Sequence, residues 1–449
     1  MFDSAEIVAD ILGNLAGLNR NIISEDFNKS LGFLKKYIPL QEHRYLSGTD
    51  CWTWTVPPGW TVKDAYIRHD DGKVLVSVKD HPLHVMSYSQ PVCQTLSGRE
   101  LLEHVYTHQE IPDAIPYEFS FYIKKWGFCL TQKQKEEIVT EKQYEVLIDS
   151  SFEPDYLVVG QYTIKGKSDE HVFLLSHLDH PFQVNDGLVG VAVNVALAKL
   201  LEKKKDLYYN YTILITSETI GSLAFLSHHE ELIPRIRCGI FNEMVGLSNP
   251  FIVQKSYKDR GLINAYAAYV LENEQGQTKS YPFLTVAGND EKVFDSPGVG
   301  VPSISLTRLD KEAQSKRKAE QGGGHVCPYP QYHSSCDDLA SINQEAVCKT
   351  VDVLEKICQV IEDDFIPRRT FKGPVFLTRY DLWVDWRKDL KMAENFLWLF
   401  YALEGDRTAF QISRDMGLDF QQVLGMLNRF YEKGLITKER ISLEFDRAA

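Results

Sequence analysis

The sequence contains little that would place the protein in a membrane or outside a cell. No run reaches the roughly 18 apolar residues that a membrane span requires, and residues 1–20 carry acidic side chains where a signal peptide has basic ones. The eight cysteines are scattered and form no CxxC pair, as is typical of reduced thiols in a large intracellular protein. We therefore expect a cytoplasmic protein that makes no contact with a membrane.

Basic residues are also scarce. Lys and Arg number 49 against 62 Asp and Glu, which gives a formal net charge of −13. A general nucleic-acid binder normally has a basic excess, so we do not expect this protein to bind nucleic acid. The apolar fraction of 44% and the charged fraction of 25% are close to those of ordinary globular domains, and 449 residues are enough for two or three of them.

The first two regions of the chain differ in their hydrophobic pattern. Residues 1–48 contain AEIVADILGNLAGL and FNKSLGFLKKYI, in which apolar residues recur at helical spacing, so we expect two helices that belong to the main domain. Residues 49–146 are rich in β-branched and aromatic residues and contain a Pro-Pro-Gly turn and an Asp-Asp-Gly hairpin signal. They predict a small inserted β-rich domain, interrupted by one helical segment, SGRELLEHVYTH.

Residues 147–366 alternate between strand and helix patterns. HVFLLSHL, NYTILITS, CGIFNEMV and VPSISLT are short apolar runs suited to central strands, and GLVGVAVNVALAKLLEKKK and SLAFLSHHEEL have the pattern of amphipathic helices. This alternation predicts an α/β three-layer sandwich with a mostly parallel central sheet. In such a sheet, polar residues at the carboxyl ends of the strands tend to line the ligand crevice.

Residues 367–449 predict a C-terminal winged helix-turn-helix domain. Three segments with helical periodicity, ending in DFQQVLGMLNRFYEKGLI, precede LITKERISLEF, which resembles a short hairpin. The segment DFQQVLGMLNRF is poor in Arg and Lys for a helix that reads a DNA groove. We expect a structural or protein-contact role for this domain.

Imidazole and carboxylate side chains recur at four strand ends of the α/β region. They are His177, Asp179, His180 and Asp186 after the first strand, Glu218 in LITSETIGS, Glu243 in IFNEMVG, and His333 in YHSSCDDL. These are the ligand types that zinc takes in catalytic sites, where three protein ligands leave a position open for water or substrate. A single His or Glu at a strand end is usually only solvated or hydrogen-bonded, but the recurrence at four ends favours a metal site.

The order of these motifs resembles that of the zinc aminopeptidase superfamily, which also contains glutamate carboxypeptidase. The motifs are HLD followed by NDGLVG, then SETIGS, FNEMVG, GNDEKVFDSPGVGVP and YHSSCDDLASI. The chain is more similar to a bacterial aminopeptidase-like subfamily that is often linked to surface-polysaccharide biosynthesis genes. That subfamily has HxxHP before the Asn-Asp turn, a β-rich insertion with a stretch like PYEFSFYIKKWGFCL (residues 116–130 here), and a C-terminal winged helix.

The resemblance implies a set of metal ligands. Asp186 corresponds to the carboxylate that bridges two metal ions in the superfamily. His177 and Glu243 correspond to ligands of one ion, and His333 corresponds to a ligand of the other. The sequence departs from the pattern at Thr219, where the superfamily has a second acidic residue that binds the second ion. A hydroxyl is a poor zinc ligand, so one tightly held Zn²⁺ is favoured over two, unless His180 takes the vacant role.

His180 has two interpretations from the sequence. It lies three residues from His177, so an extended strand would point the two rings to opposite sides, although Pro181 implies a bend between them. His180 is therefore either a metal ligand or a hydrogen-bonded imidazole in the pocket wall. Zinc is the first choice from the ligand types, and iron, cobalt or manganese also bind such N and O ligands.

The resemblance also implies two catalytic residues. Glu218 corresponds to the general base, which takes a proton from the attacking water and can return it to the leaving amine. Asp179 would orient the imidazole of His177 and fix its tautomer. The function implied is a zinc-dependent, aminopeptidase-like hydrolase that acts on a small peptide or another amide-bearing substrate.

Three further residues are candidates for contact with the substrate. Asp290 and Glu291 in GNDEKVF match a segment that shapes the substrate pocket in the relatives, and a carboxylate there could bind a substrate ammonium group or only cap a turn. Arg308 could pair with a substrate carboxylate or only be solvated. Cys327 and Cys336 lie near His325 and His333, so a Cys/His zinc knot is an alternative, although ordinary thiols and a non-ligating His325 are favoured.

Two other functions stay open from the sequence. The first is an amidase or deacylase that acts on a glycan or small conjugate in surface-polysaccharide synthesis, which the resemblance alone motivates. The second is a non-catalytic binding protein with a degenerate metal site, for which Thr219 is the support. The sequence also leaves the oligomeric state open, including a homo-oligomer.

Overall fold

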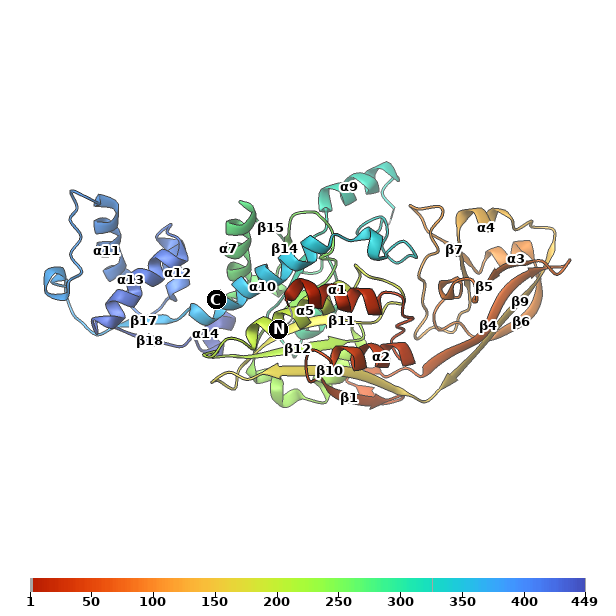
Figure 1. The fold of residues 1–449 in the computed structure, drawn as a ribbon, viewed down its shortest axis with the longest axis horizontal. Coiled ribbons are helices and arrows are strands. Elements are labelled where there is room, and N and C mark those ends of the chain that lie inside the picture. Colours follow the sequence, from red (N-terminus) through yellow and green to blue (C-terminus); the bar gives the residue numbers. More distant parts are fainter. Residues whose placement is uncertain (1–2, 325, 449) are drawn as a thin grey trace. The chain divides into compact units, whose positions relative to one another are not determined.

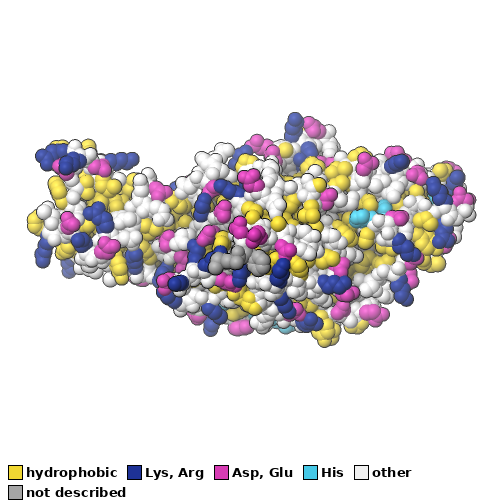
Figure 2. All heavy atoms as spheres, in the orientation of Figure 1, with side chains coloured by type: hydrophobic (Ala, Val, Ile, Leu, Met, Phe, Trp, Pro, Cys, Tyr) yellow, Lys and Arg dark blue, Asp and Glu magenta, His cyan; other side chains and the backbone are white. Residues whose placement is uncertain are grey.

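The computed structural model of the protein describes residues 3–324 and 326–448 (Figure 1). The chain divides into two compact units, Met1–Ile357 and Cys358–Ala449. Among the described residues, no helix combines the length and apolar character needed to cross a bilayer. On the face drawn in Figure 2, acidic and basic side chains are interspersed rather than separated into patches of one sign.

An eight-stranded sheet forms the centre of the first unit, in the order β1-β10-β12-β11-β13-β16-β14-β15. Its strands are β1 (Gln41–Leu46), β10 (Tyr156–Ile164), β11 (His171–His177), β12 (Asn210–Thr216), β13 (Ile236–Asn242), β14 (Ile252–Gln254), β15 (Lys279–Tyr281) and β16 (Ser303–Thr307). The central strands β12, β11, β13 and β16 are mutually parallel, whereas β10 and β14 pair with them in antiparallel fashion. The predicted α/β fold with a mostly parallel sheet is confirmed, and its outer strands make the sheet mixed.

The helices of this unit are α1 (Ser4–Leu15), α2 (Glu25–Leu34), α5 (Leu188–Leu201), α6 (Ile220–Ser227), α7 (Ile263–Gln275), α8 (Asp290–Phe294), α9 (Lys311–Glu320) and α10 (Gln344–Asp363), which contains the boundary to the second unit. α1 packs on α5, and α6 packs on α8. In β11, Ser176 lies under Gly190 of α5, whereas Phe173 contacts Phe225 of α6 and Phe294 of α8. Because alternate residues of a strand point to opposite faces, the two helix pairs cover opposite faces of the sheet.

A separate antiparallel sheet accounts for the β-rich region, in the order β5-β4-β9-β6. Its strands are β4 (Gly59–His69), β5 (Val74–Ser77), β6 (Val92–Ser97) and β9 (Gln143–Glu153), and around them lie β2 (Asp50–Cys51), β3 (Trp54–Thr55), β7 (Val105–Thr107), β8 (Phe128–Leu130), α3 (Gly98–Leu102) and α4 (Gln132–Glu136). Buried Ile67, Val146 and Ile148 belong to its core. Only the first part of SGRELLEHVYTH is helical, since β7 begins at Val105.

Two expectations about the first unit were wrong. Residues 1–48 were expected to contribute only helices to the main domain. Residues 41–46 instead form an edge strand of the central sheet, because they pair with β10. α5 is not amphipathic, since every residue from Leu188 to Ala198 is buried. The helix is enclosed between the sheet and α1, so it has no polar face to present to solvent.

The main elements of the second unit are three helices and one two-stranded ribbon. These are α11 (Leu390–Ala402), α12 (Ala409–Asp415) and α13 (Phe420–Glu432), with β17 (Ile366–Arg369) paired to β18 (Ile436–Glu439). Phe396, Leu427 and Phe430 are fully buried in its core. The hairpin expected in LITKERISLEF is wrong, because β18 pairs with the distant β17 and residues 443–448 form α14 (Leu443–Ala448).

Candidate metal centre

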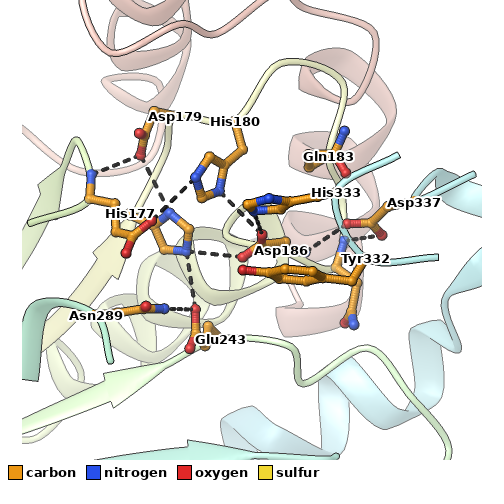
Figure 3. Close-up of polar contacts among 12 residues, drawn as sticks. His177, Asp179, His180, Gln183, Asp186, Glu243, Asn289, Tyr332, His333 and Asp337 are labelled. Atoms are coloured by element: carbon orange, nitrogen blue, oxygen red, sulfur yellow. Dashed lines mark hydrogen bonds and ion pairs between the residues drawn. The ribbon is translucent and has the colours of Figure 1, made fainter. Parts of the chain in front are cut away.

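The predicted metal ligands converge at the carboxyl ends of the parallel strands (Figure 3). His177 ends β11, Glu243 follows β13 directly, Glu218 follows β12 by two residues, and His333 lies in the loop between α9 and α10. Carboxyl ends of parallel strands meet at one edge of a sheet, which is where ligands bind in open α/β folds. The sheet therefore brings together side chains that are far apart in the sequence.

Asp186 lies at the middle of this cluster. Its Oδ1 is 3.5 Å from His177 Nε2, and its Oδ2 is 3.3 Å from His180 Nδ1 and 2.9 Å from His333 Nε2. Glu243 Oε2 lies 3.3 Å from the same nitrogen of His177. Three sets of donor atoms lie within 4.8 Å of one another: His177 with Asp186 and Glu243, His180 with Asp186 and His333, and His177 with His180 and Glu218.

The turn that carries Asp186 is held in place by Asp337. The carboxylate of Asp337 accepts the backbone N–H of Asn185 at 2.9 Å, the N–H of Asp186 at 3.0 Å and the hydroxyl of Tyr329 at 3.0 Å. Gly187 follows with φ of 100°, and a Cβ there would come within 2.9 Å of the His177 carbonyl oxygen. The turn can therefore approach the end of β11 only because residue 187 is glycine.

Several residues of the cluster have a left-handed backbone. φ is 73° at His180, 63° at Thr219, 48° at Met244 and 51° at His333. Such conformations cost about 1–3 kcal/mol each for ordinary residues and persist where the surrounding structure holds them. Their concentration around Asp186 is typical of a functional site.

The charges of the cluster are strongly coupled. Burial alone would lower the pKa of His177, but the carboxylates of Asp179, Asp186 and Glu243 hold it well above its usual range. Burial alone would raise the pKa of Asp186, but the neighbouring imidazoles, His180 foremost, hold it well below its usual range. Burial raises the pKa of Glu243 to about 8. A buried carboxylate with a raised pKa lacks a sufficient positive charge nearby, which a metal cation would supply.

Apart from the His–carboxylate ion pairs, several buried metal-donor atoms of the cluster have no hydrogen-bond partner. These buried atoms are His177 Nδ1, His180 Nδ1, Asp186 Oδ2, Glu243 Oε1 and His333 Nε2. Buried polar atoms are nearly always hydrogen-bonded, so a cluster of unpartnered ones requires an explanation. Imidazole nitrogens and carboxylate oxygens at this spacing fit a divalent cation such as Zn²⁺.

Glu218 differs from the other carboxylates in its exposure. Its side chain is 25% exposed, whereas those of Asp179, Asp186 and Glu243 are at most 2% exposed. Its Oε2 lies 3.3 Å from His180 Nε2, and its backbone N–H donates to Asp179 Oδ1 at 2.9 Å. The same Asp179 oxygen is 3.4 Å from His177 Nδ1. Glu218 is thus the carboxylate of the cluster that a molecule from solvent can reach.

The three predicted substrate residues do not belong to these sets of donors. Asp290 accepts the backbone N–H of Thr219 at 3.2 Å, and burial raises its pKa to about 6. Glu291 accepts the side-chain amide of Gln254 at 2.9 Å, and burial raises its pKa to about 7. The guanidinium of Arg308 lies 4.0 Å from the ring centroid of Phe251. Asp290 and Glu291 therefore support the loops around the site, and substrate contact by these three residues stays a prediction.

The alternative zinc knot does not form among the described residues. The metal-binding groups found there contain no cysteine, and His333 belongs to the group with His180 and Asp186. Cys327 and Cys336 are both free thiols. His325 lies outside the described residues.

Three supporting residues, Arg20, Asn289 and Asp337, were not identified from the sequence. Arg20, fully buried, donates to the carbonyl oxygens of Leu178 at 2.8 Å and Gln183 at 2.7 Å, so it holds the backbone on both sides of His180 and Pro181. The amide of Asn289 donates to Glu243. Nothing in the local pattern around Arg20 or Asn289 distinguishes them, whereas the paired acids of YHSSCDDL were a signal for Asp337.

Comparison with known proteins agrees with this geometry. The family profile described as "Domain of unknown function (DUF4910)" matches residues 9–364. A Clostridium acetobutylicum protein named "Putative polysaccharide biosynthesis protein with aminopeptidase-like domain" is 33% identical over 364 residues, which cover 80% of this chain and 78% of the relative. The chain belongs to the DUF4910 family of aminopeptidase-like proteins. The resemblance predicted from the motifs is confirmed.

Solved structures place this DUF4910 protein in the same fold as zinc aminopeptidases. A crystal structure of a "putative peptidase" from Clostridium acetobutylicum has a TM-score of 0.81 and 29% identity, and the match covers 97% of each chain. A zinc aminopeptidase from Bacillus subtilis has a TM-score of 0.59 and 14% identity, with 80% of this chain and 94% of that chain covered. At that identity, the second likeness concerns the fold alone.

Proposed function

We propose that the protein is a metal-dependent hydrolase of an amide bond, of the aminopeptidase type. The observation that carries the proposal is the arrangement of two sets of three donors around one shared carboxylate, Asp186, with Glu218 beside them and open to solvent. The substrate is a small peptide or another molecule with an amide group.

The donor sets support two cation positions. One set is His177, Asp186 and Glu243, and the other is His180, Asp186 and His333. The sequence favoured a single ion because Thr219 replaces an acidic ligand. His180 instead supplies an imidazole beside Asp186 and His333, so it compensates for the missing carboxylate. Zn²⁺ fits these N and O donors.

The reaction would use the chain's own groups around the bound cation. A divalent cation in such a site polarises the substrate carbonyl and makes water more acidic. Glu218 accepts the proton of the attacking water on its carboxylate and donates it to the nitrogen of the leaving amine. Asp179 holds the backbone N–H of Glu218 and faces Nδ1 of His177, so it positions both the base and the imidazole.

Replacement of the base provides the test. Glu218→Gln keeps the shape of the side chain but removes the proton acceptor, so we expect kcat to fall by at least about a hundredfold, the usual contribution of general-base catalysis. Bound zinc, measured by mass spectrometry, should stay at the wild-type level. Near-normal turnover by this variant would show that Glu218 is not the base.

A second substrate class has support from the relative's description. An amidase or deacylase that acts on a glycan precursor would use the same cluster and the same base. A panel of aminoacyl amides without turnover, together with hydrolysis of an amide-bearing amino sugar, would decide for this class. Turnover of the aminoacyl amides alone would decide for the peptidase.

A non-catalytic protein with a degenerate site makes a contrary prediction about metal. The unpartnered donors of the cluster should bind zinc, so protein purified without added metal should take it up on titration. A chain that stays free of metal at stoichiometric zinc would favour the non-catalytic role.

A further inference from the structure

The β-rich insertion contributes directly to the rim of the metal centre. The backbone N–H of Tyr117 donates to the carbonyl oxygen of His333 at 2.7 Å, and Pro116 forms a β-bridge with Ser334. The buried ring of Tyr117 lies 5.4 Å from the ring of His180 and 5.2 Å from that of His333. The segment that begins at residue 116 is thus attached to the loop that carries one of the metal donors.

Beyond Tyr117, the same segment forms the wall of a cavity of about 380 Å³. Phe119 and Tyr122 of the insertion line it together with Trp54, while Asp179 and Glu218 of the α/β region line it from the other side. A cavity of this size suits one moiety of a small ligand. The proposed base therefore opens into a chamber whose opposite wall is aromatic.

The aromatic side chains of this wall are exposed and contact one another or the neighbouring backbone. The exposed fractions are 41% for Trp54, 41% for Phe119 and 52% for Tyr122. The Tyr122 hydroxyl donates to the carbonyl oxygen of Thr55 at 2.9 Å, and its ring packs edge-on against Trp54 with 5.7 Å between centroids. Phe119 stacks on Phe121 at 4.6 Å. Large exposed aromatic groups that are fixed in place are typical of a binding surface.

We propose that this cavity binds a ring with an apolar face on the leaving-amine side of the substrate. The inference rests on the proposed function, because Glu218 as the base must lie next to the leaving nitrogen. Whatever is attached to that nitrogen then extends into the chamber along Phe119 and Tyr122. Fixed aromatic walls favour a flat partner, which stacks or packs edge-on against them. An aromatic side chain and a sugar ring both offer such a face.

The test measures binding of amines that share a charge but differ in shape. Benzylamine, glucosamine and open-chain n-pentylamine are titrated calorimetrically into the full-length, zinc-loaded protein. We expect at least one ring amine to bind about tenfold more tightly than pentylamine, and Tyr122→Ala and Phe119→Ala each to remove most of that difference. Tyr122→Phe should retain it. Tyr156→Ala, at a tyrosine that is 43% exposed outside the cavity, is the matched control.

The possible outcomes distinguish a failure of the proposed ring subsite from a failure of the proposed hydrolase function. Preference for benzylamine would assign the cavity to aromatic side chains, and preference for glucosamine would assign it to sugar rings. Equal binding of all three amines, or an unchanged preference in both alanine variants with wild-type zinc content and circular dichroism, would overturn the ring subsite. Glu218→Gln removes the carboxylate beside the ammonium group, so it should weaken all three amines alike and leave the ring preference unchanged. If that variant also kept turnover, the assigned base would be wrong whatever the cavity binds.

Discussion

The first unit buries a cluster of imidazoles and carboxylates, whereas the described residues of the second unit hold no such metal-binding group and include highly exposed aromatic side chains. In the first unit, His177, Asp186 and Glu243 are almost fully buried. In the second unit, Trp398 is 68% exposed and Tyr401 is 73% exposed. Every metal-binding group found among the described residues lies in the first unit. Burial of charge is costly unless the charges have partners, so the first unit's arrangement is consistent with a selected chemical role.

The two units also differ in the packing that stabilises them. The first unit tolerates left-handed backbone at four positions around Asp186, because a large enclosed sheet and its helices hold them there. The second unit has an apolar core that includes Phe396, Leu427 and Phe430. We therefore expect substitutions in the first unit to affect chemistry most and those in the second to affect stability most.

The largest effect should come from the shared carboxylate. Asp186→Ala removes an oxygen donor from both cation positions, so we expect zinc content to fall to near zero and kcat/KM to fall by at least about a thousandfold. Metal analysis and an amide-hydrolysis assay measure the two effects. The exposed Asp113→Ala should leave both unchanged. Full zinc content in Asp186→Ala would show that the donors do not share this carboxylate.

A smaller effect should follow from loss of His180. His180→Ala takes one donor from the set with Asp186 and His333 but leaves His177, Asp186 and Glu243 together. We expect zinc content to fall from two ions to one per chain and activity to fall by about ten- to a hundredfold. Unchanged zinc content would mean that His180 is a hydrogen-bonded imidazole in the pocket wall and would favour a single ion.

A substitution in the apolar core of the second unit should lower the stability of that unit and leave zinc binding unchanged. Leu427→Ala creates a cavity among buried apolar residues and should lower the free energy of unfolding of this unit by about 2–5 kcal/mol. Trp398→Ala, at an exposed position, should change it by no more than about 0.5 kcal/mol. Urea unfolding measures both, and zinc content should remain at the wild-type level. Loss of zinc in Leu427→Ala would contradict the separation between the units.

The smallest effect concerns acid sensitivity at the start of β11. Burial, with the positive charges of Lys165 and Arg235, lowers the pKa of His171 to about 4. In the unfolded chain this imidazole takes up a proton near pH 6.5, so the stability it contributes is present above about pH 6.5 and is lost as the pH falls toward 4. Urea unfolding at pH 7.5 and 4.5 should show a smaller loss for His171→Gln than for the wild type. Equal losses would contradict the shift.

Much of the central fold follows from local pattern. The runs HVFLLSHL and CGIFNEMV predicted β11 and β13 because strands buried on both faces are apolar throughout. The polar residues that end these runs had to meet at one edge once the strands were parallel. Convergence of His177, Asp186 and Glu243 was therefore predictable, while their role as ligands stays a proposal.

The remaining features depend on contacts that sequence pattern does not contain. β17 and β18 pair although 66 residues lie between Arg369, the last residue of β17, and Ile436, the first residue of β18. The contact of Tyr117 with the His333 loop and the buried position of Arg20 are equally long-range. Exposed aromatic residues such as Tyr122 give no local signal that distinguishes a cavity wall from a core position.

The carboxylate of Asp337 has a consequence for the order in which the protein becomes competent. During synthesis, the strands that carry His177, Glu218 and Glu243 leave the ribosome long before residue 337 does. Until then, the backbone of Asn185 and Asp186 lacks the two hydrogen bonds that aim the shared carboxylate. A nascent chain therefore holds most of the donors before the shared carboxylate is positioned, and the two hydrogen bonds can form only after residue 337 has emerged.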